Sequence, residues 1–288
     1  MILFHSAAKI VKTQQITKEK EVFYQKKAKI LFFFVPLSII HLIWLFMADT
    51  MVLVVHVRGQ EERRKFIQEQ LDRQGLPFHF ILDGNIEDLT PEVLDRYFVH
   101  DGKPDTMYGP FPRTSCAYKH LLATQYILDH QLEGALIIED DLRFYPHFRP
   151  MFAKSMEECA LRYAGQPVII NYEESSLLFV PRSRRVKGQL LYPADRDRYA
   201  GCYYLSRQAA QVIMDYVTEH KSDTTSDCLH CRLIKCGQLL SLWSHPCLAC
   251  QCSADGSMPT TIPTKSRPYK RLKWFYKRIY KHLLYYFR

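Results

Sequence analysis

Residues 135–141 read Ala-Leu-Ile-Ile-Glu-Asp-Asp, so four apolar residues run directly into three carboxylates. A short apolar run of this kind is typical of a strand that is buried on both faces of an α/β sheet. Open α/β sheets bind ligands at the carboxyl ends of their strands, where Glu139, Asp140 and Asp141 would lie. Adjacent carboxylates repel one another unless a cation or a basic group offsets their charge. The stretch therefore predicts either a site for a divalent cation and a diphosphate, or a solvated acidic turn.

Strands and helices are expected to alternate on both sides of this stretch. The expected strands are 52–57, 78–82, 167–170, 186–192, 199–205 and 239–243. The expected helices are 60–74, 91–97, 114–130 with Thr114 as its cap, 151–163, 206–220 and 227–235. This alternation indicates an α/β domain with a mostly parallel sheet, and we expect that domain to cover residues 51–257.

The net charge of +9 is concentrated at the two ends of the chain. Residues 265–288 contain nine Lys or Arg and no acid, and residues 1–50 carry +4, which leaves −4 for residues 51–264. The basic isoelectric point therefore describes the ends and not the expected catalytic domain. Nine cysteines, an odd number in a chain of 288 residues, favour a reducing compartment over a disulfide framework.

An apolar run over residues 30–48 is just long enough to cross a bilayer as a helix. Only Asp49 and Thr50 separate it from the expected first strand, so a spanning helix would have no stem. Three interpretations of residues 1–50 stay open. The segment is a membrane anchor, an upstream extension with Met51 as the natural start, or a cleaved signal, although no small-residue cleavage site is evident.

Residues 258–288 are expected to form a linker and a basic amphipathic helix. One helical face would carry Leu272, Phe275, Tyr276, Ile279, Leu283 and Tyr286, while Lys270, Arg271, Lys277, Arg278 and Lys281 would lie largely on the other side. Aromatic residues combined with Lys and Arg suit an anionic membrane surface. The apolar stripe is too wide for a protein that binds a nucleic-acid groove, so we expect a membrane partner and no nucleic acid.

The cysteines near the end of the domain have the spacing of a four-thiolate zinc site. Cys228 and Cys231 form one C-x2-C pair, and Cys247 and Cys250 form another after fifteen residues. However, the first pair falls inside an expected helix, and no glycine follows either pair as a turn. We therefore expect no zinc at these thiols.

Six segments, in order, resemble glycosyltransferase family 25, the bacterial lipopolysaccharide and lipooligosaccharide glycosyltransferases. They are Arg58 with Glu62-Arg63-Arg64, 80–84 ending in Asp-Gly, 115–120, 137–141, 199–209, and Asp227 with Pro246 and Gln251. Residues 115–120 resemble the family's Gly-Cys-x-x-Ser-His, and 199–209 its Gly-x-x-Tyr-x-(Leu/Ile)-Ser-x-x-Ala. Ser115 replaces the family's Gly and Lys119 its Ser, while His120 is kept. The likeness covers roughly residues 52–257.

The resemblance implies a GT-A-type fold, the Rossmann-like α/β fold of nucleotide-diphospho-sugar transferases. Asp140 and Asp141 would bind Mn²⁺ or Mg²⁺ and the diphosphate in a DXD-like motif. Glu139 would orient a loop or a neighbouring Arg beside the donor. The strand ends place Arg58, Arg63 and Asp83 at the nucleotide edge, unless these residues form only surface ion pairs.

Two further residues are candidates for catalysis. His120 would be a donor or acceptor in the cleft, with a buried, satisfied histidine as the alternative. Asp227 would be the general base that takes the proton of the acceptor hydroxyl, with Asp223, Glu173 and Glu174 as rivals. A helix N-cap is the alternative role for Asp227.

Together these features predict a metal-dependent transfer of a hexose, galactose or glucose, with inversion. The donor would be a UDP-sugar and the acceptor a lipid-linked oligosaccharide of lipopolysaccharide or lipooligosaccharide. We expect the protein at the cytoplasmic face of the inner membrane, bound peripherally or through a single span. The alternative is a non-catalytic membrane-surface protein that retains the sugar-nucleotide fold, which the substitutions at Ser115 and Lys119 motivate.

Overall fold

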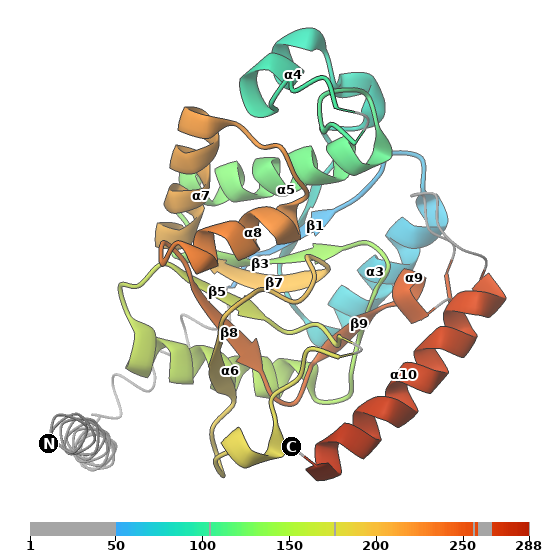
Figure 1. Cartoon of the computed structure of the whole chain (residues 1–288), viewed down its shortest axis with the longest axis vertical. Helices are drawn as coiled ribbons and strands as arrows, with labels where there is room; N and C mark the ends of the chain where they lie inside the picture. Colours follow the sequence, from blue (N-terminus) through green and yellow to red (C-terminus); the bar gives the residue numbers. More distant parts are fainter. Residues whose placement is uncertain (1–49, 104, 176, 256, 259–266, 288) are drawn as a thin grey trace, which may run out of the picture. The chain divides into compact units, whose positions relative to one another are not determined.

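The computed structural model describes residues 50–103, 105–175, 177–255, 257–258 and 267–287 (Figure 1). The predictions made for residues 1–49, including the apolar run 30–48, lie outside these residues. No helix in the described ranges is both long enough and apolar enough to span a membrane.

Within the described residues, seven strands form one sheet in the order β2-β1-β3-β7-β5-β8-β6. Five strands run in one direction, and β7 and β6 run against them. The α/β fold with a mostly parallel sheet is therefore confirmed. The strands are β1 (Val52–Val55), β2 (Phe78–Ile81), β3 (Gly134–Glu139), β5 (Val168–Asn171), β6 (Leu191–Ala194), β7 (Cys202–Ser206) and β8 (Leu240–Ser244).

Helices cover both faces of this sheet (Figure 1). One face packs against α5 (Pro112–Asp129), α7 (Arg207–His220) and α8 (Ser226–Lys235), and the other against α3 (Glu61–Gln74) and α6 (Phe148–Tyr163). Ala135 and Ile137 of β3 enter the first core, and Leu136 and Ile138 enter the second. Full burial of a Leu or Ile side chain stabilises a fold by about 1.5–3 kcal/mol. Residues 135–138 of this strand are all apolar because they are buried on both sides.

Two helices begin earlier than predicted. The helix expected from Thr114 starts at Pro112, with Phe111 as its N-cap. Proline suits the first helical position because it has no N–H to leave unpaired. The Thr114 hydroxyl instead donates to the carbonyl oxygen of Met107. The helix expected from residue 151 starts at Phe148 and contains Pro150 in its first turn, where proline is tolerated. The short helix α4 (Pro91–Tyr97) has the predicted bounds.

The strand predicted over 186–192 is largely wrong. The segment first makes a turn, in which Gly188 has φ +86° and the hydroxyl of Tyr192 accepts from the backbone N–H of Val186. β6 then begins at Leu191 and lies at the edge of the sheet, where Pro193 is tolerated because an edge strand has fewer partners to satisfy.

A second, two-stranded sheet was not predicted. β4 (Leu142–Phe144) pairs antiparallel with β9 (Ala249–Gln251), about a hundred residues later, and the short helix α9 (Cys252–Asp255) follows. The pairing brings Gln251 beside the carboxyl end of β3. The remaining short elements are the 3₁₀ helices η1 (Ile86–Asp88) and η2 (Arg182–Arg184).

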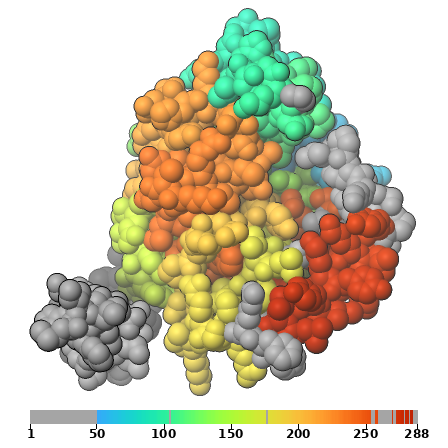
Figure 2. Space-filling view, in the orientation of Figure 1, coloured from blue at the N-terminus to red at the C-terminus, as the bar shows by residue number. Residues whose placement is uncertain are grey.

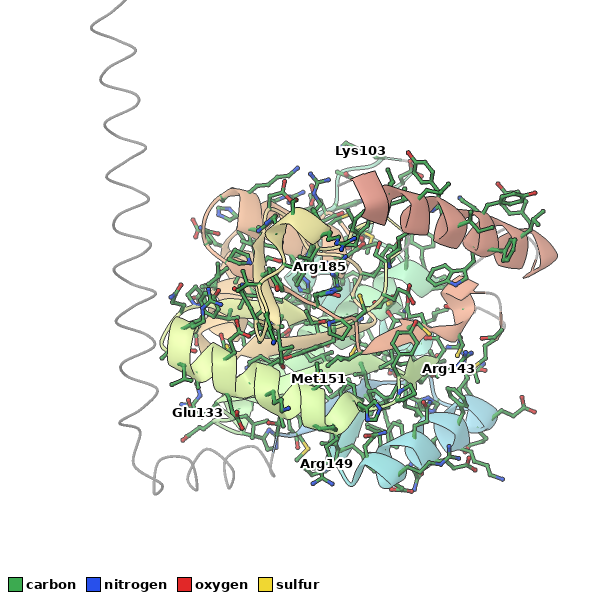
Figure 3. The ribbon with its side chains drawn as sticks, turned by 90° about the horizontal axis from the view of Figure 1, so that it is seen from below. Lys103, Glu133, Arg143, Arg149, Met151 and Arg185 are labelled. Carbon is green, nitrogen blue, oxygen red and sulfur yellow. The ribbon has the colours of Figure 1, made fainter. Side chains whose placement is uncertain are left out.

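The C-terminal helix α10 (Arg267–Phe287) lies against the body of the protein through a buried lysine (Figure 2). Lys281 Nζ is 3.1 Å from Glu174 Oε1 and 3.1 Å from the carbonyl oxygen of Ser175. Several side chains project from this helix away from the sheet (Figure 3). Its exposed large apolar residues are Tyr269, Leu272, Phe275, Tyr276, Ile279, Tyr280 and Leu283. The helix is therefore docked by a polar contact and presents apolar side chains to solvent.

Candidate active site

A cavity of about 460 Å³ opens at the carboxyl ends of β1 and β3. β2 and β3 flank β1 on opposite sides, and α3 and α5 lie on opposite faces, so this edge is the topological switch point at which open α/β sheets bind ligands. A volume of a few hundred Å³ is typical of small-molecule sites. The predicted site residues that line the cavity are Arg58, Arg63, His120, Glu139, Asp140, Asp141 and Asp227.

Asp140 is buried between two basic side chains. His56 Nδ1 lies 2.8 Å from its Oδ2, and Arg63 Nη1 lies 2.6 Å from its Oδ1. Asp140 is 3% exposed, so its charge depends on these partners for stabilisation. Asp140 therefore anchors Arg63 in the cavity wall.

Asp141 is equally buried but less completely paired. Its Oδ2 accepts from the backbone N–H of Ser253 at 3.1 Å, and Arg63 Nη2 lies 3.5 Å away. In the part of the chain that the structure describes, Oδ1 has no hydrogen-bond partner. Burial, with a smaller contribution from the Glu139 charge, raises the pKa of Asp141 to about 6. A buried carboxylate oxygen without a donor can accept a cation.

Glu139 is oriented by Gln251, which the β4–β9 pairing places beside it. Gln251 Nε2 donates to Glu139 Oε2 at 2.8 Å. This contact requires a glycine at position 201, because a Cβ there would lie 2.6 Å from Cδ of Gln251. The close packing of Gln251 therefore explains why the Tyr199–Ala209 segment has a glycine at position 201. With Oε2 held, Glu139 Oε1 faces Cys116 and His120.

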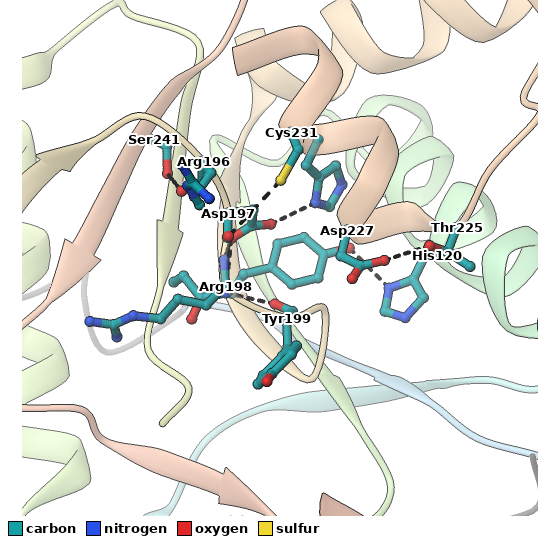
Figure 4. A network of polar contacts seen from close by, with 12 residues as sticks. His120, Arg196, Asp197, Arg198, Tyr199, Thr225, Asp227, Cys231 and Ser241 are labelled. Carbon is teal, nitrogen blue, oxygen red and sulfur yellow. Dashed lines mark hydrogen bonds and ion pairs between the residues drawn. The ribbon is translucent and has the colours of Figure 1, made fainter. Parts of the chain in front are cut away.

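His120 projects from α5 toward the end of β3 (Figure 4). Its Nδ1 lies 3.0 Å from the hydroxyl of Tyr203, and its Nε2 lies 3.6 Å from Glu139 Oε1. Cys116, one turn earlier on α5, has its Sγ 4.0 Å from the same oxygen. Burial, followed by the charge of Glu139, raises the pKa of the Cys116 thiol. His120 is buried but has only one nitrogen hydrogen-bonded among the described residues, so it is not a fully satisfied core histidine.

Asp227 lies in the first turn of α8 (Figure 4) and lines the cavity. Thr225 is the N-cap of this helix, so the alternative role of Asp227 as an N-cap is wrong. Thr225 Oγ1 donates to Asp227 Oδ1 at 2.6 Å. Among the described residues, no hydrogen bond is found to its other carboxylate oxygen, and the side chain is half-buried.

The three rival carboxylates do not line the cavity. Asp223 pairs with Arg232 at 2.7 Å, and Glu174 contacts Lys281 and the hydroxyl of Tyr145. Glu173 is fully buried, which raises its pKa well above the usual value. Of the four candidate bases, Asp227 alone combines partial exposure with a place in the cavity.

The three residues predicted to contact a nucleotide do not all line the cavity. Arg58 lines the cavity and pairs with Glu87 at 3.0 Å and Asp88 at 2.7 Å. Asp83 does not line it; its side chain is 90% exposed and lies 3.7 Å from Arg58. Asn85, two residues later, is buried in the wall, and its Nδ2 lacks a partner within the described ranges. Asn85 is the better placed residue for recognising a ligand.

The two residues that depart from the family pattern support the same loop. Ser115 Oγ donates to the carbonyl oxygen of Gly84 at 2.7 Å. Lys119 Nζ donates to the carbonyl oxygens of Leu82 at 2.9 Å and Asp83 at 2.8 Å. Burial lowers the pKa of Lys119 to about 8. Both substitutions therefore satisfy backbone groups at the end of β2.

The four cysteines with zinc-like spacing are not gathered in one place. All nine cysteines are free thiols; Cys228 is exposed, whereas Cys250 is buried. Cys231 Sγ lies 4.0 Å from the carbonyl oxygen of Asp197, and Cys247 Sγ 3.2 Å from Arg198 Nη1. No three of these four thiols meet as a ligand group among the described residues. The expectation that they bind no zinc stays a prediction.

The sequence profile of glycosyltransferase family 25 (LPS biosynthesis protein) matches residues 49–230 of this chain. A Haemophilus influenzae protein provisionally named a glycosyltransferase is 23% identical over 181 residues, which are 61% of this chain and 61% of that protein. This chain therefore aligns with less than two thirds of that relative. The crystal structure of a glycosyltransferase involved in the glycosylation of the major capsid of PBCV-1 is 10% identical, has a TM-score of 0.39, and is matched over 78% of this chain and 99% of that chain. A TM-score of this size supports no further conclusion.

Proposed function

The chain belongs to glycosyltransferase family 25, and from this premise we propose that it transfers a hexose, galactose or glucose, from a UDP-sugar to a saccharide acceptor of lipopolysaccharide or lipooligosaccharide. One observation carries the proposal. The acidic end of β3, two arginines and a partly exposed carboxylate on α8 converge on a single cavity at the switch point of the sheet. An anionic donor with a leaving diphosphate requires cationic groups on one side and a base on the other.

The donor would lie along the β1 and β2 edge. Arg63 projects from the first turns of α3 and is 12% exposed, so it can exchange a contact with Asp140 for one with a phosphate. Asn85 offers an amide nitrogen, which matches the carbonyl groups of a uracil base. Arg58 completes this edge, while Asp83 is exposed and does not line the cavity.

A divalent cation fits the residues at the end of β3. Asp141 keeps one buried oxygen without a partner among the described residues, and carboxylates are the ligands of Mg²⁺ and Mn²⁺. Asp140 would contribute only after release from Arg63, since both of its oxygens are engaged. When bound, the ion would neutralise the developing charge of the leaving diphosphate.

Asp227 would act as the general base. It would take the proton of the acceptor hydroxyl as a bond forms between the acceptor oxygen and the anomeric carbon. The bond between that carbon and the UDP oxygen would break on the opposite face, which gives inversion. The hydrogen bond from Thr225 holds the carboxylate in place for this step.

The proposal is tested by measuring UDP release from a panel of UDP-sugars, with GDP- and CMP-sugars for comparison, with and without Mn²⁺ and a lipooligosaccharide acceptor. We expect release that depends on acceptor and metal, and is fastest with UDP-galactose or UDP-glucose. No release from any donor would favour the alternative, a non-catalytic membrane-surface protein. The contacts of Ser115 and Lys119 argue against that alternative, because both side chains support the loop of the donor edge.

We also propose that α10 binds an anionic membrane, which would place the enzyme at the cytoplasmic face of the inner membrane. Its aromatic and aliphatic side chains are exposed: Phe275 is 60% and Ile279 is 44% accessible. Such residues beside Lys and Arg suit the boundary between headgroups and acyl chains. Lys281 would keep the helix attached to the body, close to the segment that follows β5.

Replacing both Phe275 and Ile279 with serine is expected to make vesicle binding fully reversible by salt. Salt screens the attraction of Lys and Arg to anionic lipid but leaves apolar burial intact, so the unsubstituted protein should be released only partly. The measurement is co-sedimentation with anionic vesicles at low and high salt. The control replaces Leu161 and Val186, which are exposed on the body, with serine. Equal salt release of all three proteins would contradict the proposal. Deletion of α10 is a less specific test, because it would also remove Lys281, the ion-pair partner of Glu174.

A further inference from the structure

A thiol, an imidazole and a carboxylate meet in the wall of the cavity. Cys116 Sγ, His120 Nε2 and Glu139 Oε1 are all within 4.8 Å of one another. In the part of the chain that the structure describes, this is the only group of three or more His, Cys, Asp or Glu side chains that converges in this way. This group does not include Asp140, whose carboxylate pairs with His56 and Arg63. Its sulfur and nitrogen atoms are softer metal ligands than carboxylate oxygens.

The spacing of these atoms is close to that of a tetrahedral site. Typical Zn–S, Zn–N and Zn–O bond lengths correspond to ligand separations of roughly 3.4–3.6 Å around a tetrahedron. The observed separations from Glu139 Oε1 are 3.6 Å to His120 Nε2 and 4.0 Å to Cys116 Sγ. Side-chain adjustments of a few tenths of an ångström would bring both into range. The third separation, between Cys116 Sγ and His120 Nε2, is within 4.8 Å.

Hydrogen bonds to Tyr203 and Gln251 orient the side chains of His120 and Glu139 for binding a metal ion. His120 is 2% exposed, and its Nε2 has no hydrogen-bond partner among the described residues. If Nδ1 donates to the Tyr203 hydroxyl, Nε2 presents a lone pair to the group. Gln251 fixes Oε2 of Glu139 and leaves Oε1 toward the other two ligands. These are the outer contacts that orient metal ligands in proteins.

The ligands also come from rigid elements. Cys116 and His120 are four residues apart on α5, so they share one face of the helix, and Glu139 ends the buried strand β3. Thiolate, imidazole and carboxylate together prefer ions softer than Mg²⁺. Three protein ligands leave a fourth position, which in zinc enzymes is taken by water or substrate.

We propose that Cys116, His120 and Glu139 bind a borderline-soft divalent metal ion, of which Zn²⁺ is the type, with the fourth position open to the cavity. Binding releases the thiol proton to solvent and forms a metal–sulfur bond. The ion would occupy the His120 nitrogen that could otherwise exchange protons with a ligand. This site does not depend on the transferase activity, and its test needs no substrate.

The test is titration of the purified, metal-free full-length protein with Co²⁺, whose bond to a thiolate gives a charge-transfer absorption in the near ultraviolet. We expect one equivalent to bind with that absorption, and Zn²⁺ to displace it. Cys116→Ser should abolish the absorption. Cys228→Ser and Cys236→Ser, which alter exposed thiols, are matched controls and should leave it unchanged.

A second variant acts through the orienting contact. Gln251→Ala should retain the absorption but weaken Co²⁺ binding about 10–100-fold, as is typical when an outer contact of a ligand is lost. Circular dichroism verifies that each variant is folded. The proposal is overturned by absence of the thiolate absorption in the unsubstituted protein, by its persistence in Cys116→Ser, or by its loss in a control.

Discussion

Asp141→Asn is expected to lower sugar transfer at least about a hundredfold while the protein stays folded. A metal ion at a leaving group contributes several kcal/mol, and about 1.4 kcal/mol is a factor of ten in rate. Asparagine keeps the shape of the side chain and an oxygen that can accept from the backbone N–H of Ser253. It removes a buried charge, so the folded state should lose little stability. The measurement is the transfer rate at saturating Mn²⁺, together with thermal unfolding.

Asp83→Asn is the matched control for this prediction. Its side chain is exposed and outside the cavity, so transfer should change less than about twofold, as for most surface substitutions. A transfer rate near that of the unsubstituted protein in Asp141→Asn, in metal-replete buffer, would refute the role of Asp141. A large loss in Asp83→Asn would restore the sequence-based assignment of that residue to the nucleotide.

Asp140→Ala is a less informative change than the sequence suggests. The sequence leads to the expectation that alanine at either aspartate spares the fold. Asp140 is buried with His56 and also pairs with the partly exposed Arg63, and removal of one member of a buried pair costs about 3–5 kcal/mol. Loss of transfer in that variant would therefore combine lost function with lost stability.

The sequence predicts the centre of the fold because its signals there are local. The apolar run of residues 135–138 indicates a strand buried on both faces, and β3 is that strand. The carboxylates that follow must then lie at the carboxyl edge, which β1 shares because it is parallel to β3. Strand ends and a helix start also lead to the prediction that Arg58, Arg63 and Asp83 meet at this edge; Arg58 and Arg63 line the cavity, whereas Asp83 does not.

What the sequence does not predict depends on distant contacts. Gln251 reaches Glu139 only through the pairing of β4 with β9, and three-residue strands carry no periodic pattern. Asp83 precedes a glycine with φ +87°, a conformation that redirects the loop and leaves Asn85 in the wall. The lysine at position 119 departs from the family pattern, which motivates the non-catalytic alternative, yet its amine satisfies two carbonyl oxygens just after β2. Residue type alone cannot distinguish these outcomes.

Asp227→Asn is expected to lower the transfer rate about 10²–10⁴-fold while affinity for UDP changes little. That range is typical for removal of a general base. Asparagine can still accept the hydrogen bond from Thr225, so the first turn of α8 should keep its position. Asp227 is not one of the residues proposed to contact the nucleotide, so its replacement should leave those contacts in place. Transfer kinetics and UDP binding by calorimetry measure the two effects separately.

The comparison of variants assigns the role of Asp227. Asp223→Asn is the matched control, because Asp223 lies just before the same helix but pairs with Arg232 outside the cavity, a contact worth at most about 1 kcal/mol. It should retain transfer. If Asp227→Asn weakened UDP binding as much as it slowed transfer, Asp227 would be a donor ligand and not the base. If instead binding survives and transfer is lost, Asp227 acts in the transfer step and not in binding the nucleotide. The product formed by the unsubstituted enzyme should then have the inverted anomeric configuration by NMR.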